Sequence, residues 1–240
     1  MMNQYALVTG ADHGVGFCLV ADLLERGYFV FAGRINPEEK LLEQLKEKFP
    51  DRLEIILLDI GSDDSVAEMK RIVSEKVPYI NLLINNAGIL GDISKSIYDE
   101  LDFEEMQQVL NVNALGTLRV TNALAALVMK SNQKLIVNIS SEAGSIGQCE
   151  REGWFAYCMS KAANNMQSAL VHNKIRKEGG KVVIIHPGHV ATYMRGHLDR
   201  DAKITPEESA AAILKLVLDK ELPVTEKPLY LDYQGEPLVW

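Results

Sequence analysis

Two residues able to exchange a proton stand four positions apart in the stretch YCMSK, namely Tyr157 and Lys161. On a helix, positions i and i+4 lie on one face, with about 5–6 Å between their Cβ atoms. A cation at that distance favours the ionised form of an acid, so we expect Lys161 to lower the pKa of Tyr157 from its usual value of about 10. The pair therefore predicts a proton donor near neutral pH. Because so short a motif also arises by chance, other parts of the chain have to support this chemistry.

A glycine-rich turn follows the first apolar run of the chain, in the stretch TGADHGVG. Gly10, Gly14 and Gly16 let the backbone turn tightly and approach a pyrophosphate, and the helix that follows offers free N–H groups at its N-terminus. The spacing differs from G-x-G-x-x-G, the commonest dinucleotide fingerprint. Its place directly after the first strand favours dinucleotide binding over a strand-to-helix turn without a ligand.

The end of the second predicted strand, in FAGRINPEE, has no acidic residue at the place where one usually binds an unphosphorylated ribose. Gly33 stands there, and Arg34 follows it. A guanidinium group presents a planar fork that suits a phosphate, so we expect NADP(H) to be favoured over NAD(H). A solvated surface arginine is the alternative. His13, inside the glycine-rich turn, either adds to the phosphate site or only lines the loop.

Polar residues also follow the third and fourth predicted strands. Asp59 is placed to accept a hydrogen bond from an adenine amino group, and helix capping is the alternative, with Ser62 and Asp63 as the better caps. The fourth strand closes with NNAG, residues 85–88, whose amides and glycine suit a close approach to a ribose or ring. They equally suit a tight turn that satisfies its own backbone groups.

Three further polar clusters lie later in the chain. Asn113 stands among apolar positions in NVNALG, where its amide either has partners in the core or holds water at a site. Ser140 and Ser141 follow the fifth strand, where a hydroxyl either binds a substrate carbonyl or caps a turn. The sixth strand leads into HPGHVAT, a loop in which Thr192 is placed to meet a carboxamide.

These clusters need a scaffold, and short apolar runs alternate along the chain with amphipathic segments. We expect strands over 5–10, 28–33, 53–59, 80–88, 134–140, 181–188 and 228–233. We expect helices over 16–27, 37–49, 65–76, 103–129, 155–177 and 206–220, with Pro37 and Pro206 at helix starts and Gly27 after a helix end. Such alternation predicts a mostly parallel sheet covered on both faces. The expected fold class is α/β, a doubly wound (Rossmann) sheet of about seven strands in a single domain over residues 1–240.

Composition narrows the classes of function. A net charge of −8 over 240 residues, with a pI near 5.2, argues against nucleic-acid binding. The apolar runs are too short to cross a bilayer and no signal peptide is recognised, so we expect no membrane association. Cys18, Cys149 and Cys158 are odd in number and scattered, which suits a reducing, cytoplasmic location. No metal site is predicted.

Taken together, TGADHGVG, NNAG, NVNALG, NISS, YCMSK and HPGHVAT resemble the short-chain dehydrogenase/reductase family, in its order and near its spacing, over residues 5–195. The closing stretch YLDYQGEPLVW and the insertion before the tyrosine are similar to carbonyl-reductase-like members. The resemblance implies an NADP-dependent oxidoreductase that reduces a ketone or aldehyde to an alcohol, reversibly. The implied partner is a small-molecule carbonyl or alcohol substrate.

The resemblance also assigns roles to single residues. Tyr157 would be the general acid in reduction and the base in oxidation, with Lys161 lowering its pKa and holding the nicotinamide ribose. Ser141 would polarise the carbonyl, and Asn113 would position a water in a proton relay. The implied catalytic residues are therefore Asn113, Ser141, Tyr157 and Lys161. The implied cofactor-binding residues are Gly10, His13, Gly14, Val15, Gly16, Arg34, Asp59, Ile60, Asn86, Ala87, Gly88, Tyr157, Lys161, Pro187, Gly188, Val190 and Thr192.

One departure from the family pattern is the distance between serine and tyrosine. Ser141 precedes Tyr157 by 16 positions, where the family commonly shows about 13. The extra residues, within 148–154, predict a larger loop that either contacts substrate or is a solvated bulge. If this loop displaces Ser141, Ser140 or Ser145 provides the hydroxyl.

The segment 193–204 is too short for a separate substrate domain, so we expect a mobile lid with Tyr193, Met194 and His197 as substrate contacts. The helices over 103–129 and 155–177 carry apolar residues beyond one stripe, which favours a homodimer or a homotetramer.

Two other functions are weighed against the reductase. An NADP-binding sensor or signalling protein with little turnover needs no proton donor, so the Tyr157–Lys161 pair argues against it. A Rossmann-like methyltransferase fits the glycine-rich turn but gives no role to that pair or to Arg34.

Overall fold

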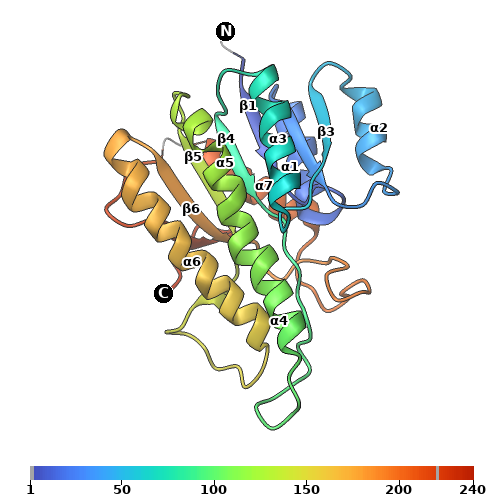
Figure 1. Cartoon of the computed structure of the whole chain (residues 1–240), viewed down its shortest axis with the longest axis vertical. Coiled ribbons are helices and arrows are strands. Elements are labelled where there is room, and N and C mark those ends of the chain that lie inside the picture. Colours follow the sequence, from blue (N-terminus) through green and yellow to red (C-terminus); the bar gives the residue numbers. More distant parts are fainter. Residues whose placement is uncertain (1–2, 220–221) are drawn as a thin grey trace.

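The computed structural model describes residues 3–219 and 222–240, and one parallel sheet organises them (Figure 1). Its seven strands follow the order β3-β2-β1-β4-β5-β6-β7, and neighbouring strands pair in parallel. The strands are β1 (Tyr5–Val8), β2 (Phe29–Arg34), β3 (Leu53–Leu57), β4 (Leu82–Asn85), β5 (Leu135–Ile139), β6 (Lys181–His186) and β7 (Leu229–Asp232). Strand order reverses between β1 and β4, where a doubly wound sheet opens its ligand crevice. The predicted fold class is confirmed.

Helices cover both faces of the sheet (Figure 1). They are α1 (Gly14–Glu25), α2 (Leu41–Lys48), α3 (Asp63–Lys76), α4 (Phe103–Leu110), α5 (Thr117–Met129), α6 (Phe155–Ile175) and α7 (Pro206–Leu218). Helices α1 and α7 pack together on one face, and α3, α5 and α6 lie on the other. The helix predicted over 206–220 ends earlier, at Leu218, and its predicted last position lies outside the described residues.

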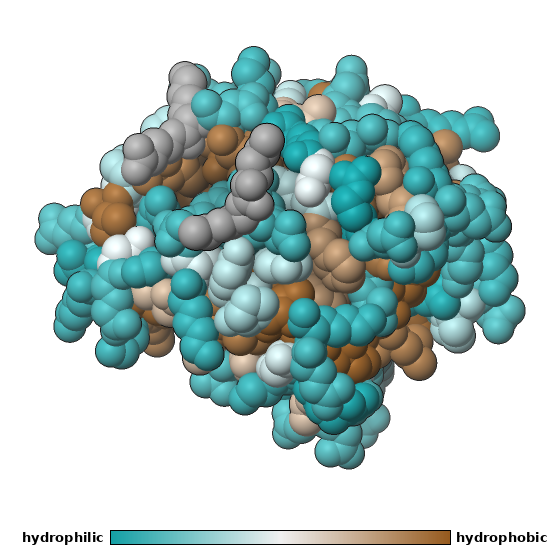
Figure 2. All heavy atoms as spheres, turned by 90° about the horizontal axis from the view of Figure 1, so that it is seen from above, coloured by the Kyte–Doolittle hydropathy of each residue, from teal (hydrophilic) through white to brown (hydrophobic). Residues whose placement is uncertain are grey.

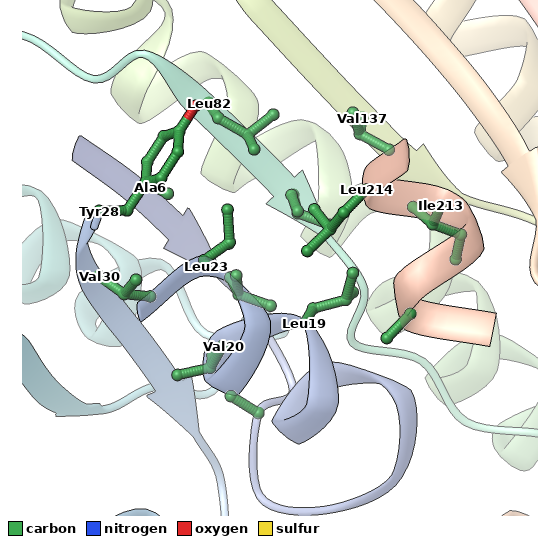
Figure 3. Packing of buried hydrophobic residues seen from close by; sticks show 14 of the residues in the cluster. Ala6, Leu19, Val20, Leu23, Tyr28, Val30, Leu82, Val137, Ile213 and Leu214 are labelled. Carbon is green, nitrogen blue, oxygen red and sulfur yellow. The ribbon is translucent and has the colours of Figure 1, made fainter. Parts of the chain in front are cut away.

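A buried apolar cluster joins the first face of the sheet to its helices (Figure 3). Leu19 and Leu23 of α1 meet Ile213 and Leu214 of α7 over strand residues such as Leu82, and all five side chains are fully buried. Burying one such side chain contributes about 1.5–3 kcal/mol. This packing fixes α1, and with it the turn that precedes α1.

Side-chain caps explain where several helices begin. The helix start predicted at Pro206 is confirmed, and Thr205 and Glu208 form a reciprocal capping box around it. Ser62 caps α3 through the Ser65 N–H. The helix start predicted at Pro37 is wrong, because residues 37–38 form a turn and α2 begins only at Leu41. The Asn36 side chain accepts from the Glu38 N–H at 3.0 Å, which holds this segment as a turn.

The segment predicted as one helix over 103–129 contains a π-helical turn, η1 (Asn111–Gly116), between α4 and α5. Such turns are frequent at functional sites because they re-aim a side chain within a helix. This continuous helix has 27 residues and contains an 18-residue window with a mean hydropathy of 1.3, so by length and composition alone it is long and apolar enough to cross a membrane. Here Val120, Leu124 and Val128 are fully buried against the sheet, which accounts for part of that hydropathy.

The edge of the sheet at the amino ends of the strands faces the viewer in Figure 2, where hydrophilic residues surround smaller hydrophobic patches. The motifs singled out in the sequence follow the carboxyl ends of the strands, at the opposite edge. The candidate site therefore lies there.

Candidate active site

Tyr157 and Lys161 lie in the first two turns of α6 and point to the same side of the helix. The Lys161 Nζ atom is 5.5 Å from the centre of the Tyr157 ring. Both residues are buried, at 8% and 3% exposure. The ammonium donates a 3.1 Å hydrogen bond to the carbonyl of Ile139, the last residue of β5. The predicted helical pair is thus present, docked on the carboxyl end of a central strand.

Burial changes the proton affinities of this pair. It raises the pKa of Tyr157 to about 12, and it lowers the pKa of Lys161 to about 8. The expected acidification of Tyr157 by Lys161 is therefore not found. Loss of solvent disfavours the charged form of both groups, and this effect outweighs the attraction that a cation offers. At neutral pH the phenol keeps its proton and Lys161 is largely charged.

Ser141 is the serine that faces the tyrosine. Its hydroxyl interacts with Tyr157 and acts to lower the pKa of the phenol, against the larger effect of burial. Its Oγ atom accepts from the Ala143 N–H at 3.1 Å. The other two candidates have different partners, because Ser140 donates to Asn165 and Ser145 accepts from the backbone of Gln148. The longer loop has not displaced Ser141.

Asn113 lies in the π-helical turn and clamps the chain that follows β4. Its Oδ1 accepts from the Ile89 N–H and its Nδ2 donates to the Ile89 carbonyl, both at 2.8 Å. Nδ2 also donates to the Ser160 hydroxyl, beside Lys161 on α6. A Cβ atom added at Gly88 would lie 3.2 Å from Asn113 Oδ1 and 3.6 Å from Lys161 Nζ. The side-chain amide thus has partners in the protein and holds the loop that lies against the lysine.

The glycine-rich turn forms a cradle that larger residues would fill. A Cβ atom at Gly10 would lie 2.7 Å from Ala87, and one at Gly16 would lie 2.1 Å from the Gly10 carbonyl. Asn86 stabilises the turn by donating to the carbonyls of Thr9 and Gly10, at 3.0 and 2.9 Å. The bare backbone at the N-terminus of α1 fits the pyrophosphate of a dinucleotide.

The loop after β6 lies against this cradle. A Cβ atom at Gly14 would come within 3.4 Å of the Thr192 side chain. The Pro187 carbonyl accepts from Ser209 of α7 at 2.7 Å, and Val190 pairs with Ile204 as an isolated bridge. Gly188 has φ +89°, a conformation that favours glycine. Val15, in the first turn of α1, is 9% exposed and belongs to the core.

Arg34, at the end of β2, is held by acidic and backbone groups. Its Nη1 atom is 2.5 Å from Glu43 Oε1 and donates to the Glu39 carbonyl at 3.0 Å. The Arg34 side chain is 15% exposed, whereas His13 is exposed in front of α1. A phosphate at Arg34 would have to compete with Glu43 for the guanidinium group.

Asp59 takes the alternative role of a local cap. Its Oδ1 accepts from the Gly61 N–H at 2.8 Å, and the side chain is exposed beside the start of α3. Ile60 is buried and lies against Gly116, where a Cβ atom would come within 2.8 Å of its side chain. A contact between Asp59 and an adenine stays a prediction.

The loop 148–154 lies at the rim of the site. Arg151 makes a 2.7 Å ion pair with Glu142, the residue that follows the candidate serine Ser141. The guanidinium carbon of Arg151 lies 5.1 Å from the centre of the Trp154 ring. Trp154 has φ +64° and meets Tyr157 edge-to-face at 6.2 Å. Arg195 lies 5.8 Å from the same indole ring. The loop therefore contacts the tyrosine through Trp154, and it contacts the segment 193–204 as well.

The candidate lid residues Tyr193, Met194 and His197 are exposed. Their contact with substrate and the mobility of the segment stay predictions. Within the segment, Arg195 lies 3.4 Å from Asp199, and Asp199 accepts from His189 at 2.8 Å.

Sequence reasoning missed three charged residues at the site: Asp12, Glu142 and Arg195. Asp12 is buried, and its carboxylate accepts from the backbone N–H of Ile35 and Asn36 at 2.7–3.1 Å, which ties the glycine-rich turn to β2. The sequence did contain a signal for two of them, because Asp12 stands inside the glycine-rich turn and Glu142 directly follows Ser141. Nothing local distinguishes Arg195, because only folding brings it to Trp154.

Known proteins share this architecture. A sequence model described as short chain dehydrogenase matches residues 4–203. Retinol dehydrogenase 16 of Rattus norvegicus is 34% identical over 194 residues, which are 80% of this chain and 58% of that protein. The chain thus spans less than two thirds of the length of the first curated relatives it matches.

Two solved structures match over the full length of both chains. NADPH-bound carbonyl reductase from chicken fatty liver has a TM-score of 0.88 at 31% identity. A short-chain dehydrogenase/reductase from Burkholderia multivorans with bound NADP has a TM-score of 0.88 at 28% identity.

Proposed function

The chain belongs to the short chain dehydrogenase family, and we propose that it is an NADP-dependent oxidoreductase that interconverts a ketone or aldehyde with its alcohol. The observation that carries the proposal is the buried set of Ser141, Tyr157 and Lys161 beside the glycine cradle. A proton donor, a carbonyl-polarising hydroxyl and a dinucleotide cradle meet at one edge of the sheet. That combination is what carbonyl reduction requires from a protein.

A bound reduced nicotinamide dinucleotide supplies the hydride. Gly10 and Gly16 let the turn pack tightly against Ala87 and Asn86, where a Cβ atom would collide with the protein. The N–H groups at the start of α1 that follow this turn suit the pyrophosphate. Lys161 holds the nicotinamide ribose, as the family resemblance implies.

Tyr157 delivers the proton to the carbonyl oxygen. With burial raising its pKa to about 12, the phenol is protonated at neutral pH and is ready to donate. A buried phenolate is costly, so the charged ammonium of Lys161 stabilises it as the proton leaves. The two side chains act as one proton-donating unit.

Ser141 polarises the substrate carbonyl. Its Oγ atom accepts from the Ala143 N–H, which fixes the oxygen beside Tyr157, so the hydroxyl can donate its proton to a carbonyl oxygen bound there. Donation to an oxygen that gains negative charge stabilises the transition state more than the ground state. Asn113 keeps the Ile89 loop against Lys161. The role of holding a relay water, which the resemblance implies for Asn113, stays a prediction.

We infer a preference for NADP(H) over NAD(H). Arg34 is a guanidinium group at the end of β2, and His13 is exposed in the turn beside it. Such groups suit a 2′-phosphate. The two full-length structural neighbours named above contain NADPH and NADP.

The test is oxidation of NADPH by the purified protein, followed at 340 nm against a panel of ketones and aldehydes. The wild type is expected to turn over at least one of them. Tyr157→Phe is expected to lower kcat by about 10²–10⁴-fold, with NADPH binding unchanged by fluorescence titration.

Tyr79→Phe is the matched control, because Tyr79 lies just before β4, at the amino edge of the sheet, where its hydroxyl donates to the Asn3 carbonyl. Full activity in Tyr157→Phe would refute the role of the phenol. NADPH binding without turnover over the whole panel would favour the sensor instead.

A further inference from the structure

Tyr230 links the last strand of the sheet to the candidate serine. Its hydroxyl donates a 2.7 Å hydrogen bond to the backbone carbonyl of Ser141, 89 positions earlier in the chain. Tyr230 is 3% exposed, so this bond is shielded from water. The Ser141 carbonyl also accepts from the Gly144 N–H at 3.0 Å. Two donors thus fix the peptide plane that carries the candidate serine.

Asn165 of α6 also holds this loop. It accepts from the Ser140 hydroxyl at 2.7 Å and donates to the Gly144 carbonyl at 3.2 Å. A Cβ atom at Gly144 would lie 2.8 Å from the backbone of Lys161, so the loop packs directly on the helix of the catalytic lysine. The loop is therefore held between α6 and β7.

The segment after β7 keeps Tyr230 in place. The chain folds back, and the Leu238 N–H donates to the Tyr230 carbonyl at 2.8 Å. The Trp240 ring lies 5.2 Å from the Tyr230 ring. The Trp240 carbonyl accepts from the Gly147 N–H at 2.9 Å, within the loop that leads from Ser141 to Tyr157. The tail thus packs on Tyr230 and binds the serine loop.

We propose that Tyr230 is a positioning residue for carbonyl reduction: its hydrogen bond to the Ser141 carbonyl aims the Ser141 hydroxyl at the substrate. The inference rests on the function proposed above. Tyr230 acts through Ser141, since its own hydroxyl is committed to the backbone. The direction of the Ser141 side chain follows from its backbone, so a freed carbonyl lets Oγ leave its place beside Tyr157.

The first test is Tyr230→Phe, which keeps the ring on Trp240 and removes only the hydroxyl. Loss of one buried hydrogen bond predicts a roughly tenfold lower kcat, with the KM for NADPH unchanged because the glycine cradle is not touched. Tyr28→Phe is the matched control: Tyr28 is also buried, and its hydroxyl lies 3.5 Å from Gln133, in the cluster that α1 helps to form. Equal effects of the two substitutions on kcat would overturn the inference.

A double-mutant cycle separates positioning from general stability. In a Ser141→Ala background, adding Tyr230→Phe is expected to change the residual kcat by less than twofold, since the hydroxyl that it positions is gone. A tenfold loss in that background as well would mean that Tyr230 acts elsewhere and would overturn the inference.

Amide hydrogen exchange at Ala143 reads the loop without any substrate, because this N–H donates to Ser141 Oγ. Exchange is expected to quicken in Tyr230→Phe and to stay at the wild-type rate in Tyr28→Phe. Unchanged exchange in Tyr230→Phe would overturn the inference even for a protein that reduces no carbonyl in the panel. If the wild type itself reduces no carbonyl in the panel, that result counts against the proposed function, and the exchange data still decide the positioning role of Tyr230.

Discussion

The chemistry of Tyr157 and Lys161 depends on how little water reaches them. Burial raises the pKa of the phenol and lowers that of the ammonium, so the two values approach each other. A proton-donating phenol needs its neighbour to be charged when the phenolate forms. The residue that limits the reduction at high pH is therefore Lys161, well before Tyr157 itself titrates.

We predict that kcat/KM for reduction is level below about pH 8 and falls above it. The pKa of Lys161 is about 8, so the charged form dominates below that pH and is lost as the pH rises through it. The profile of kcat/KM reports the free enzyme, which is the state described here. A Lys161→Met variant is expected to be much slower and to lack this decline. A decline near pH 8 that survives in Lys161→Met would assign it to another group.

At the residue scale, we predict that Arg34 and its ion-pair partner Glu43 set the proposed preference for NADPH. Arg34→Ala is expected to weaken NADPH binding by roughly 10- to 100-fold, because a charge-assisted hydrogen bond to phosphate is lost. NADH binding is expected to change little. Glu43→Gln removes the competing carboxylate at 2.5 Å and is expected to tighten NADPH binding severalfold. Calorimetric titration of both cofactors checks this, and an equal loss for NADH and NADPH in Arg34→Ala would contradict it.

At the scale of elements, two local departures from regular structure build the site. The glycine-rich turn brings backbone, not side chains, to the N-terminus of α1, and Asn86 ties that turn to the end of β4. The π-helical turn between α4 and α5 places Asn113 against Ile89 and Ser160. Both departures lie where elements from the two halves of the sheet meet.

We predict that Gly16→Ala abolishes measurable NADPH binding. The new Cβ atom would lie 2.1 Å from the Gly10 carbonyl and 2.5 Å from Asn86, so the cradle has to open. Overpacking of this kind also costs about 1–3 kcal/mol of unfolding free energy. Gly179→Ala is the control: it is strained at φ +81°, but its Cβ atom meets no atom within 4 Å among the described residues, and a left-handed alanine costs about 1–2 kcal/mol. We expect both variants to lose a similar amount of thermal stability and only Gly16→Ala to lose NADPH binding. Equal NADPH binding in the two variants would contradict the prediction.

For the whole molecule, the notable surface is formed by exposed apolar side chains on η1, α5 and α6. Leu115, Leu118, Met166 and Leu170 are 37–64% exposed, on elements that lie next to one another. In α6, positions 166 and 170 are one turn apart and share a face. Apolar side chains gathered in this way favour burial against another copy of the chain.

We predict a homodimer that buries this helical surface. Light scattering after size exclusion is expected to give twice the chain mass of 26.7 kDa. Replacing Met166 and Leu170 by Glu is expected to shift the protein towards the monomer, because two buried charges would face the partner. Leu57→Glu is the control, because Leu57 is also exposed, at 63%, but lies on the edge strand β3 and not on η1, α5 or α6. A wild type that is monomeric at micromolar concentration would contradict the prediction.

The sequence by itself determined the fold class and most of the site. Period-2 and period-3.6 patterns are local properties, so the strands and helices lie within a few residues of their predicted positions. The carboxyl ends of parallel strands share one edge, so motifs after β1, β4, β5 and β6 had to converge. The helical spacing of YCMSK and the family resemblance predicted Ser141, Tyr157 and Lys161 as one set, and the structure brings them together.

Only the tertiary structure decided the pKa values of the site residues and the long-range contacts that hold these residues in place. The pKa of Tyr157 rises because helices and loops from distant parts of the chain exclude water from it, and no spacing within YCMSK encodes that exclusion. Arg34 meets Glu43, Arg195 meets Trp154, and Tyr230 meets Ser141 across as many as 89 positions of sequence. Such contacts follow from packing between elements, which a pattern read along one segment does not contain.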